Sequence, residues 1–205
     1  MNDVKKPASG RPRSVKSHKA MLLATVQLLG EVGFDAMSIE AIAARAQVGK
    51  TTIYRRYSTK EELVADAIES IREEVSIPDR GSFWKDIHSL IDDAERITLT
   101  PLGRKSVAMI VSSASSNSKF ASIYWDKYLE PRRRAFSVVV ERAKSRGEIS
   151  NDLDPDLVFD AMSGIMLYTL IFPNTSDNWK DYVLRAMRLL IGNFKDVKIE
   201  KRRQP

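Results

Sequence analysis

Residues 38–63 read SIEAIAARAQVGKTTIYRRYSTKEEL, and this stretch predicts two short helices separated by a tight break. Ser38 is a favourable N-cap for a first helix that runs to about residue 46. Residues 47–49 interrupt the apolar periodicity, and a second short helix over 50–57 follows. A helix of this length is unstable in isolation, so it must pack against neighbouring helices.

Helices are also predicted on both sides of this stretch. Apolar residues between 21 and 32 follow helical spacing, and Gly33 is in the position of a helix-terminating glycine. Thr59 and Glu62 form a capping-box pair, which predicts a longer helix that ends before Pro78. These helices would enclose the short pair and connect it to the rest of the chain.

The remainder of the chain also has a helical pattern, with caps at Ser82, Thr100 and Asp154 and a stop at Gly147. Further helices are expected over residues 83–97, 101–114, 120–129, 132–146, 156–172 and 179–194. No segment shows the sustained alternation of a strand. The predicted fold is all-α with about nine helices, in an N-terminal three-helix helix-turn-helix domain and a C-terminal helical domain.

Charge is distributed unevenly along the chain. The first sixty residues contain eleven Lys or Arg and four Asp or Glu, a net charge of +7, whereas the whole chain carries +6. Such asymmetry indicates a polyanionic partner for the N-terminal segment. The chain contains no cysteine and two histidines, which excludes disulfides and thiolate metal sites, and no cofactor is expected.

The segment from Met21 to Leu63 resembles the DNA-binding domain of the TetR/AcrR family of bacterial regulators. The resemblance is carried, in order and spacing, by Gly33-Phe34, Ser38, Ile42-Ala43, Ala46, Val48, Thr52-Ile53-Tyr54, Tyr57 and Lys60-Glu61-Glu62-Leu63. The chain departs from the family pattern at Gln47, Gly49, Thr51 and Arg56. The resemblance implies a sequence-specific transcriptional regulator in the cytoplasm, a repressor rather than an enzyme, with no membrane partner.

The resemblance also implies which residues contact duplex DNA. Ser38, Thr52, Tyr54, Tyr57 and Lys60 are expected at phosphates, and Gln47, Lys50, Thr51 and Arg55 at bases. Arg11 and Arg13 of a basic arm are expected in the minor groove, where negative potential is concentrated. Three alternatives remain open: Tyr57 as a core residue, Ser38 as a cap alone, and the arm as a solubilising tail.

The resemblance further implies a C-terminal helical ligand-binding and dimerisation domain, which binds an unidentified, largely apolar effector and forms a homodimer that reads a near-palindromic operator. The candidate cavity residues, for which plain core is the alternative, are Met109, Trp125, Tyr128, Met162, Met166 and Tyr168. The candidate interface residues are Leu157, Ala161, Gly164, Ile165, Tyr182, Ala186 and Leu190.

The expected division of the chain is a flexible basic arm over 1–17, a helix-turn-helix domain over 18–65, a regulatory and dimerisation domain over 66–197, and a basic tail over 198–205.

Two other classes of protein are compatible with parts of this sequence. Residues 44–51, ARAQVGKT, satisfy a relaxed phosphate-loop pattern, which would indicate a nucleotide-binding enzyme. That reading requires a buried strand before the loop, whereas a helical pattern precedes it here. A membrane-surface or protein-binding α-bundle would use the basic arm as a tether, although the arm lacks large apolar anchors.

Overall fold

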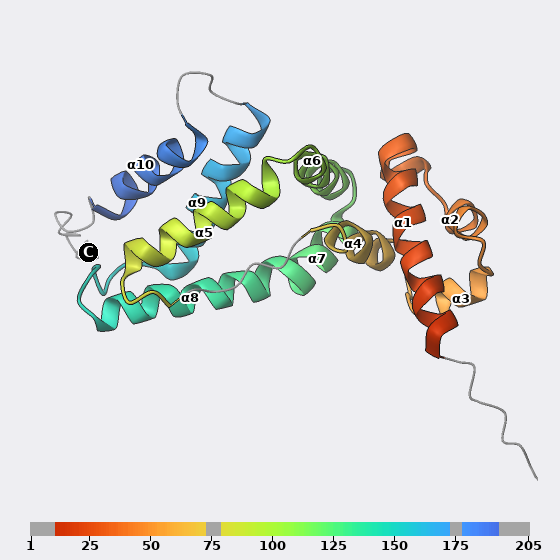
Figure 1. Cartoon of the computed structure of the whole chain (residues 1–205), viewed down its shortest axis with the longest axis horizontal. Helices are drawn as coiled ribbons and strands as arrows, with labels where there is room; N and C mark the ends of the chain where they lie inside the picture. Colours follow the sequence, from red (N-terminus) through yellow and green to blue (C-terminus); the bar gives the residue numbers. More distant parts are fainter. Residues whose placement is uncertain (1–10, 73–78, 173–177, 193–205) are drawn as a thin grey trace, which may run out of the picture. The chain divides into compact units, whose positions relative to one another are not determined.

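The computed structural model describes residues 11–72, 79–172 and 178–192, with the side chains of residues 11–14 left out of the description. Within these ranges the chain forms ten α-helices and one π-helical turn and contains no strand, which confirms the all-α prediction (Figure 1). The elements are α1 (Arg11–Ala36), α2 (Ile39–Ala46), α3 (Lys50–Tyr54), α4 (Lys60–Glu69), α5 (Phe83–Thr98), α6 (Pro101–Ser116), α7 (Ser118–Tyr124), η1 (Trp125–Leu129), α8 (Glu130–Ser145), α9 (Pro155–Ile171) and α10 (Trp179–Gly192).

The chain divides into two compact units. The N-terminal unit comprises residues 1–73 and 105–127, and the C-terminal unit comprises 74–104 and 128–205. The sequence predicted a boundary near residue 65, so the first unit is larger than expected. The added segment 105–127 belongs there because α7 packs on α4 and the buried ring of Phe120 lies 5.6 Å from that of Phe34.

The N-terminal unit is organised by α1, which packs against both α2 and α4. Its helical backbone is interrupted at Gly33, where φ is 79°, so the predicted glycine stop is confirmed. The helix starts at Arg11 rather than near Ser17, because Pro12 lies in the first turn, where a missing N–H costs nothing. Part of the predicted arm is therefore helical, and residues 1–10 lie outside the described part.

Two predicted helix boundaries differ from those observed. Helix α4 ends at Glu69 and is followed by a turn to residue 72, whereas the sequence predicted a helix from Thr59 that ends shortly before Pro78. Residues 73–78 lie outside the described part of the chain. The predicted helices 120–129 and 132–146 are joined without a break, since the turn η1 leads from α7 directly into α8. Pro131 is tolerated because it occupies the first turn of α8.

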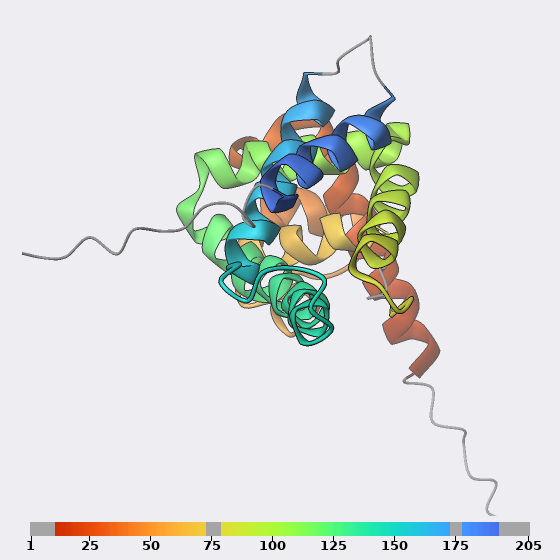
Figure 2. The same ribbon diagram turned by 90° about the vertical axis from the view of Figure 1, so that its left-hand side faces the viewer.

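The C-terminal unit has one core, formed by α5, α8, α9 and α10. Helix α10 lies beside α5 and α9, and α8 contacts the same two helices (Figures 1 and 2). The core is centred on fully buried apolar side chains, among them Phe83, Ile91, Val139 and Met187. Within the described residues, none of the helices combines the length and the apolar character that crossing a bilayer requires.

Candidate nucleic-acid interface

The helices α2 and α3 form a helix-turn-helix whose turn depends on three local features. The Ser38 hydroxyl caps α2 by accepting from the amide of Ala41 at 3.1 Å. Gln47 ends α2 in the left-handed conformation, with φ 54° and ψ 43°, and the Val48 amide then donates to the Ala43 carbonyl at 3.0 Å. Residues 44–51 are thus helix, turn and helix, and the phosphate-loop interpretation is wrong because helix α2, not a strand, leads into the turn.

Helix α3 has one buried face and one exposed polar face. Ile53 is fully buried, as is Ile42 of α2, and the two helices pack against each other. On the other face Lys50, Thr51 and Arg55 are exposed, and the side chain of Tyr54 is 55% exposed. The outward face of α3 therefore presents two cations, a hydroxyl and a phenol, which are the groups that contact phosphates and base edges.

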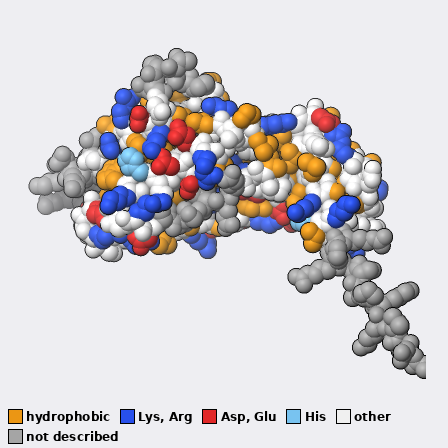
Figure 3. Space-filling model, in the orientation of Figure 1, with side chains coloured by type: hydrophobic (Ala, Val, Ile, Leu, Met, Phe, Trp, Pro, Cys, Tyr) orange, Lys and Arg blue, Asp and Glu red, His pale blue; other side chains and the backbone are white. Residues whose placement is uncertain are grey.

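The basic residues of this surface are partly paired with acids in the free protein. Lys50 donates to Glu40 at 3.0 Å, and this hydrogen bond raises the pKa of Lys50 and lowers that of Glu40. Arg45 pairs with Glu31 at 2.7 Å. Figure 3 shows basic side chains spread over the visible face of the N-terminal unit. Because both pairs are exposed, phosphates can compete for these cations at little cost.

Tyr57 is a correction to the predicted set of phosphate contacts. Its side chain is 5% exposed, and its hydroxyl is bonded to His18 Nε2 at 2.8 Å. Burial raises the pKa of the Tyr57 phenol, and Asp66 raises it further. This hydroxyl serves the interior of the unit, where it connects α1 to the segment after α3, rather than the outward surface.

Lys60 is also used within the fold. Its ammonium donates to the carbonyls of Phe34 at 2.8 Å and Met37 at 3.0 Å, and it lies 4.4 Å from the centre of the Phe34 ring. Lysine near the carboxyl end of a helix compensates carbonyls that have no helical partner, so Lys60 has a structural role at the end of α1. An ammonium has three protons, so one remains for a phosphate.

The other predicted contacts are placed as follows. Ser38 and Gln47 are exposed at the two ends of α2, whereas Thr52 is half-buried. The side chains of Arg11 and Arg13 lie outside the described part of the chain. The structure therefore brings Gln47, Lys50, Thr51, Tyr54 and Arg55 together on the turn and the exposed face of α3.

The predicted cavity residues are divided between the two units. Met109 and Trp125 belong to the N-terminal unit, and the other four to the C-terminal unit. Trp125 is 37% and Tyr168 61% exposed, so neither is enclosed, while Met162 is buried in the C-terminal core. The prediction assumed that these apolar side chains face a shared interior, and periodicity within single helices could not test that assumption.

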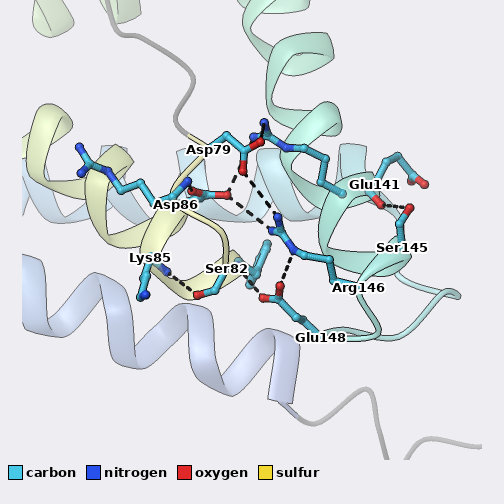
Figure 4. A network of polar contacts seen from close by, with 11 residues as sticks. Asp79, Ser82, Lys85, Asp86, Glu141, Ser145, Arg146 and Glu148 are labelled. Atoms are coloured by element: carbon cyan, nitrogen blue, oxygen red, sulfur yellow. Dashed lines mark hydrogen bonds and ion pairs between the residues drawn. The ribbon is translucent and has the colours of Figure 1, made fainter.

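The sequence reading did not identify an ionic network that joins the start of α5 to the end of α8 (Figure 4). Asp86 is fully buried, accepts from the Arg80 amide at 2.7 Å, and lies 3.9 and 3.8 Å from the guanidinium groups of Arg142 and Arg146. Asp79 pairs with both arginines. The sequence does contain two acids seven residues apart, Asp79 and Asp86, and two arginines four residues apart, Arg142 and Arg146. It does not show that these two distant pairs meet, because their contacts are long-range.

Comparison with known proteins supports the geometry. Residues 21–67 match the family model described as bacterial regulatory proteins, tetR family, and residues 77–190 match the tetracyclin repressor-like C-terminal domain. The chain belongs to the TetR family. It is 32% identical over 189 residues to the helix-turn-helix regulator YdeS of Bacillus subtilis strain 168. The matched residues cover 92% of this chain and 93% of YdeS.

Other proteins match this chain at lower sequence identity, again over most of the length of both chains. The DNA-binding transcriptional repressor TetR of Mycobacteroides abscessus is 28% identical over 182 residues, covering 83% of this chain and 88% of that protein. The fold is shared with FadR of Bacillus subtilis, solved in complex with stearoyl-CoA, at a TM-score of 0.61 and 16% identity over 85% of this chain and 97% of FadR. These matches show that our chain is a helix-turn-helix transcriptional regulator of the TetR family.

Proposed function

We propose that this TetR-family regulator is a homodimeric repressor that binds a near-palindromic operator in the bacterial cytoplasm and is released from it by a small, largely apolar effector. The observation that carries the DNA-binding part is the exposed face of α3, where Lys50, Thr51, Tyr54 and Arg55 project from a helix anchored only through Ile53. This division into one anchoring residue and four outward polar residues suits insertion into a major groove.

The test of this part is operator selection from random duplexes followed by gel shifts. Arg55→Ala should weaken binding by about 1–3 kcal/mol if Arg55 reads a base. Arg134→Ala is the matched control, because Arg134 is an exposed arginine of the C-terminal unit, paired with Glu130. Affinity should also fall steeply with salt, since phosphate contacts release counterions. Equal affinity of the Arg55 variant and wild type would contradict the assignment of α3.

The homodimer is supported by an apolar stripe on α9. Leu157, Ala161, Gly164 and Tyr168 recur every three or four residues and so lie on one side of the helix. Phe172 follows the end of α9, and its ring lies 5.4 Å from that of Tyr168. Leu157, Tyr168 and Phe172 are more than half exposed, although each is large and apolar or aromatic. An apolar stripe left uncovered in one chain indicates an interface, and in a symmetric dimer the same stripe meets itself.

The remaining predicted interface residues fit this proposal to different degrees. Leu190 of α10 is exposed at 37%, and Tyr182 and Ala186 are half-buried on the same helix. Ile165 also packs partly against the core of the C-terminal unit, so it contributes less to an outward surface. The interface is therefore proposed to centre on the α9 stripe, with α10 at its edge.

Gly164 allows a sharp test of the dimer. A Cβ at this position would meet nothing within 4 Å, so Gly164→Leu leaves the single chain unstrained while blocking close approach of a second helix. Ser163→Leu, at the adjacent exposed position, is the control. Light scattering should show dissociation of the Gly164 variant at concentrations where wild type and control are dimeric. A Gly164 variant as dimeric as the control would move the interface elsewhere.

The effector is proposed from the family and from the FadR complex, whose fold this chain shares. An effector can weaken DNA binding only through different affinities for the operator-bound and free conformations. A coupling of about 1–3 kcal/mol would change operator affinity roughly 5- to 150-fold. A thermal-shift screen of apolar compounds, followed by operator titration with each hit, tests this. Hits that stabilise the protein yet leave operator affinity unchanged would refute the release mechanism and not the DNA binding.

A further inference from the structure

A small open pocket lies on the surface of the N-terminal unit, between the end of α1 and α6. Its volume is about 230 Å³, and its lining combines apolar Leu29, Phe34 and Met109 with Lys105, Ser112 and Ser113. Glycines 30 and 33 and Ala108 complete the lining. None of these residues belongs to the proposed operator-binding face. Since one water occupies about 30 Å³ of liquid, the pocket has room for an occupant of about eight non-hydrogen atoms.

The buried side of this pocket contains a polar group without a partner. Ser113 is 1% exposed, and its hydroxyl forms no hydrogen bond with any residue that the structure describes. A buried hydroxyl left unpaired is unfavourable, and helix residues such as Ser115 avoid this by donating to the carbonyl four residues earlier. The Ser113 hydroxyl is closed off by its neighbours in this conformation, and a rotation of its side chain would present it to a polar atom of an occupant.

The exposed side of the pocket contains an ammonium group. No carboxylate among the described residues pairs with Lys105. Its side chain lies across α1 at Gly30, where an added Cβ would come within 2.7 Å of Lys105 Nζ and 2.8 Å of its Cε. Gly30 has no left-handed backbone to explain it, and glycine within a helix is less favourable than alanine. The end of the Lys105 side chain therefore lies close over Gly30, although this flexible side chain could move aside for a larger residue.

We propose that this pocket binds a small organic acid, with the carboxylate on Lys105, an apolar body against Leu29, Phe34 and Met109, and a second polar atom on the Ser113 hydroxyl. A planar hydroxyaryl carboxylate has this order of groups, and 4-hydroxybenzoate, with ten non-hydrogen atoms, is close to the available size. The site is separate from any effector cavity of the C-terminal unit, and it does not depend on the repressor mechanism proposed above.

The test uses the full-length protein with 13C-labelled methionine methyl groups, titrated with 4-hydroxybenzoate. The Met109 methyl lies in the lining, so its signal, assigned with Met109→Leu, should shift saturably with a dissociation constant of about 1 mM or tighter. The methyl signals of Met162 and Met187, which belong to the C-terminal core, should not move. A Met109 signal that does not saturate at concentrations of about 10 mM would overturn the proposal.

Variants locate the binding groups. Lys105→Gln should weaken binding about fivefold, the effect of one partly exposed ion pair, whereas Lys85→Gln, at an exposed lysine of the C-terminal unit, should not. Ser113→Ala should abolish any preference for 4-hydroxybenzoate over benzoate and should melt no lower than wild type, because its hydroxyl has no bond to lose. Unchanged affinity and preference in both pocket variants would show that the acid binds elsewhere and would overturn the assignment.

Discussion

Replacing Gln47 by glycine is expected to stabilise the protein and to weaken its binding to DNA. Gln47 is the non-glycine residue with positive φ in the described part of the chain, at φ 54° and ψ 43°. A side chain in this left-handed conformation costs about 1–2 kcal/mol, and glycine avoids that cost. Glycine in turn loses about 0.5–1 kcal/mol more conformational freedom on folding. The net gain in the free energy of unfolding should be about 0–1.5 kcal/mol, or about 0.7 kcal/mol at the middle of both ranges.

The side chain of Gln47 is exposed at the turn, so its removal should lower operator affinity if it reads a base. A bidentate contact of glutamine to adenine contributes about 1–3 kcal/mol. Gln47→Ala is the matched variant, because it keeps the strained backbone and removes the amide, and so should bind DNA weakly without any gain in stability. Urea unfolding followed by circular dichroism measures the first effect, and gel shifts on the selected operator measure the second.

The unfolding measurement tests the cost of the left-handed backbone, and the gel shift tests whether the Gln47 side chain contacts DNA. If Gln47→Gly is no more stable than Gln47→Ala, the left-handed conformation carries no cost and the argument from backbone strain fails. If Gln47→Gly is more stable but binds the operator like wild type, strain is present and the side chain does not read DNA. Strain kept at a position where glycine would relieve it is expected at functional sites.

Three further predictions concern the same unit. Glu40→Gln should raise operator affinity about two- to fivefold in gel shifts, because it frees Lys50 from its exposed ion pair and removes a negative charge near phosphates; unchanged affinity would mean that Lys50 does not reach DNA. Tyr57→Phe should lower the free energy of unfolding in urea by about 1 kcal/mol, because the bond to His18 is lost. If this variant also lost operator binding, Tyr57 would have to be a phosphate contact after all. Burial, then Arg56, holds the pKa of His18 below 6.5, so the folded state resists protonation and stability should fall as the pH drops below about 6.5. Thermal melts of His18→Gln should show a smaller fall, and an equal fall would exclude His18 as its source.

The parts of the fold that local chemistry determines could be predicted from the sequence. The caps at Ser38, Thr59 and Asp154 and the glycine stops at Gly33 and Gly147 are all observed. Each depends on residues within one helical turn, so a single sequence contains the whole signal. The outward position of Lys50, Thr51, Tyr54 and Arg55 could be predicted for a related reason, since Ile53 is the apolar residue among them.

Features that depend on distant residues could not be predicted in this way. The Tyr57 hydroxyl is bonded to His18, 39 positions earlier in the chain. The Lys60 ammonium donates to a carbonyl near the end of α1. Phe120 could be recognised as apolar but not as a partner of Phe34. Helical periodicity tells which side of a helix is buried and does not tell which helix covers it.

The N-terminal unit is discontinuous in sequence, since residues 105–127 belong to it while 74–104 do not. Two-part chimeric sensors are commonly conceived as one DNA reader spliced at a single junction to a foreign receptor. In this protein such a splice after α4 would discard Phe120 and Tyr124, and with them their contacts to the ring of Phe34 and the carboxylate of Glu69. A transplantable reader must therefore carry 105–127 as a second insert, and the receptor must accept three junctions rather than one.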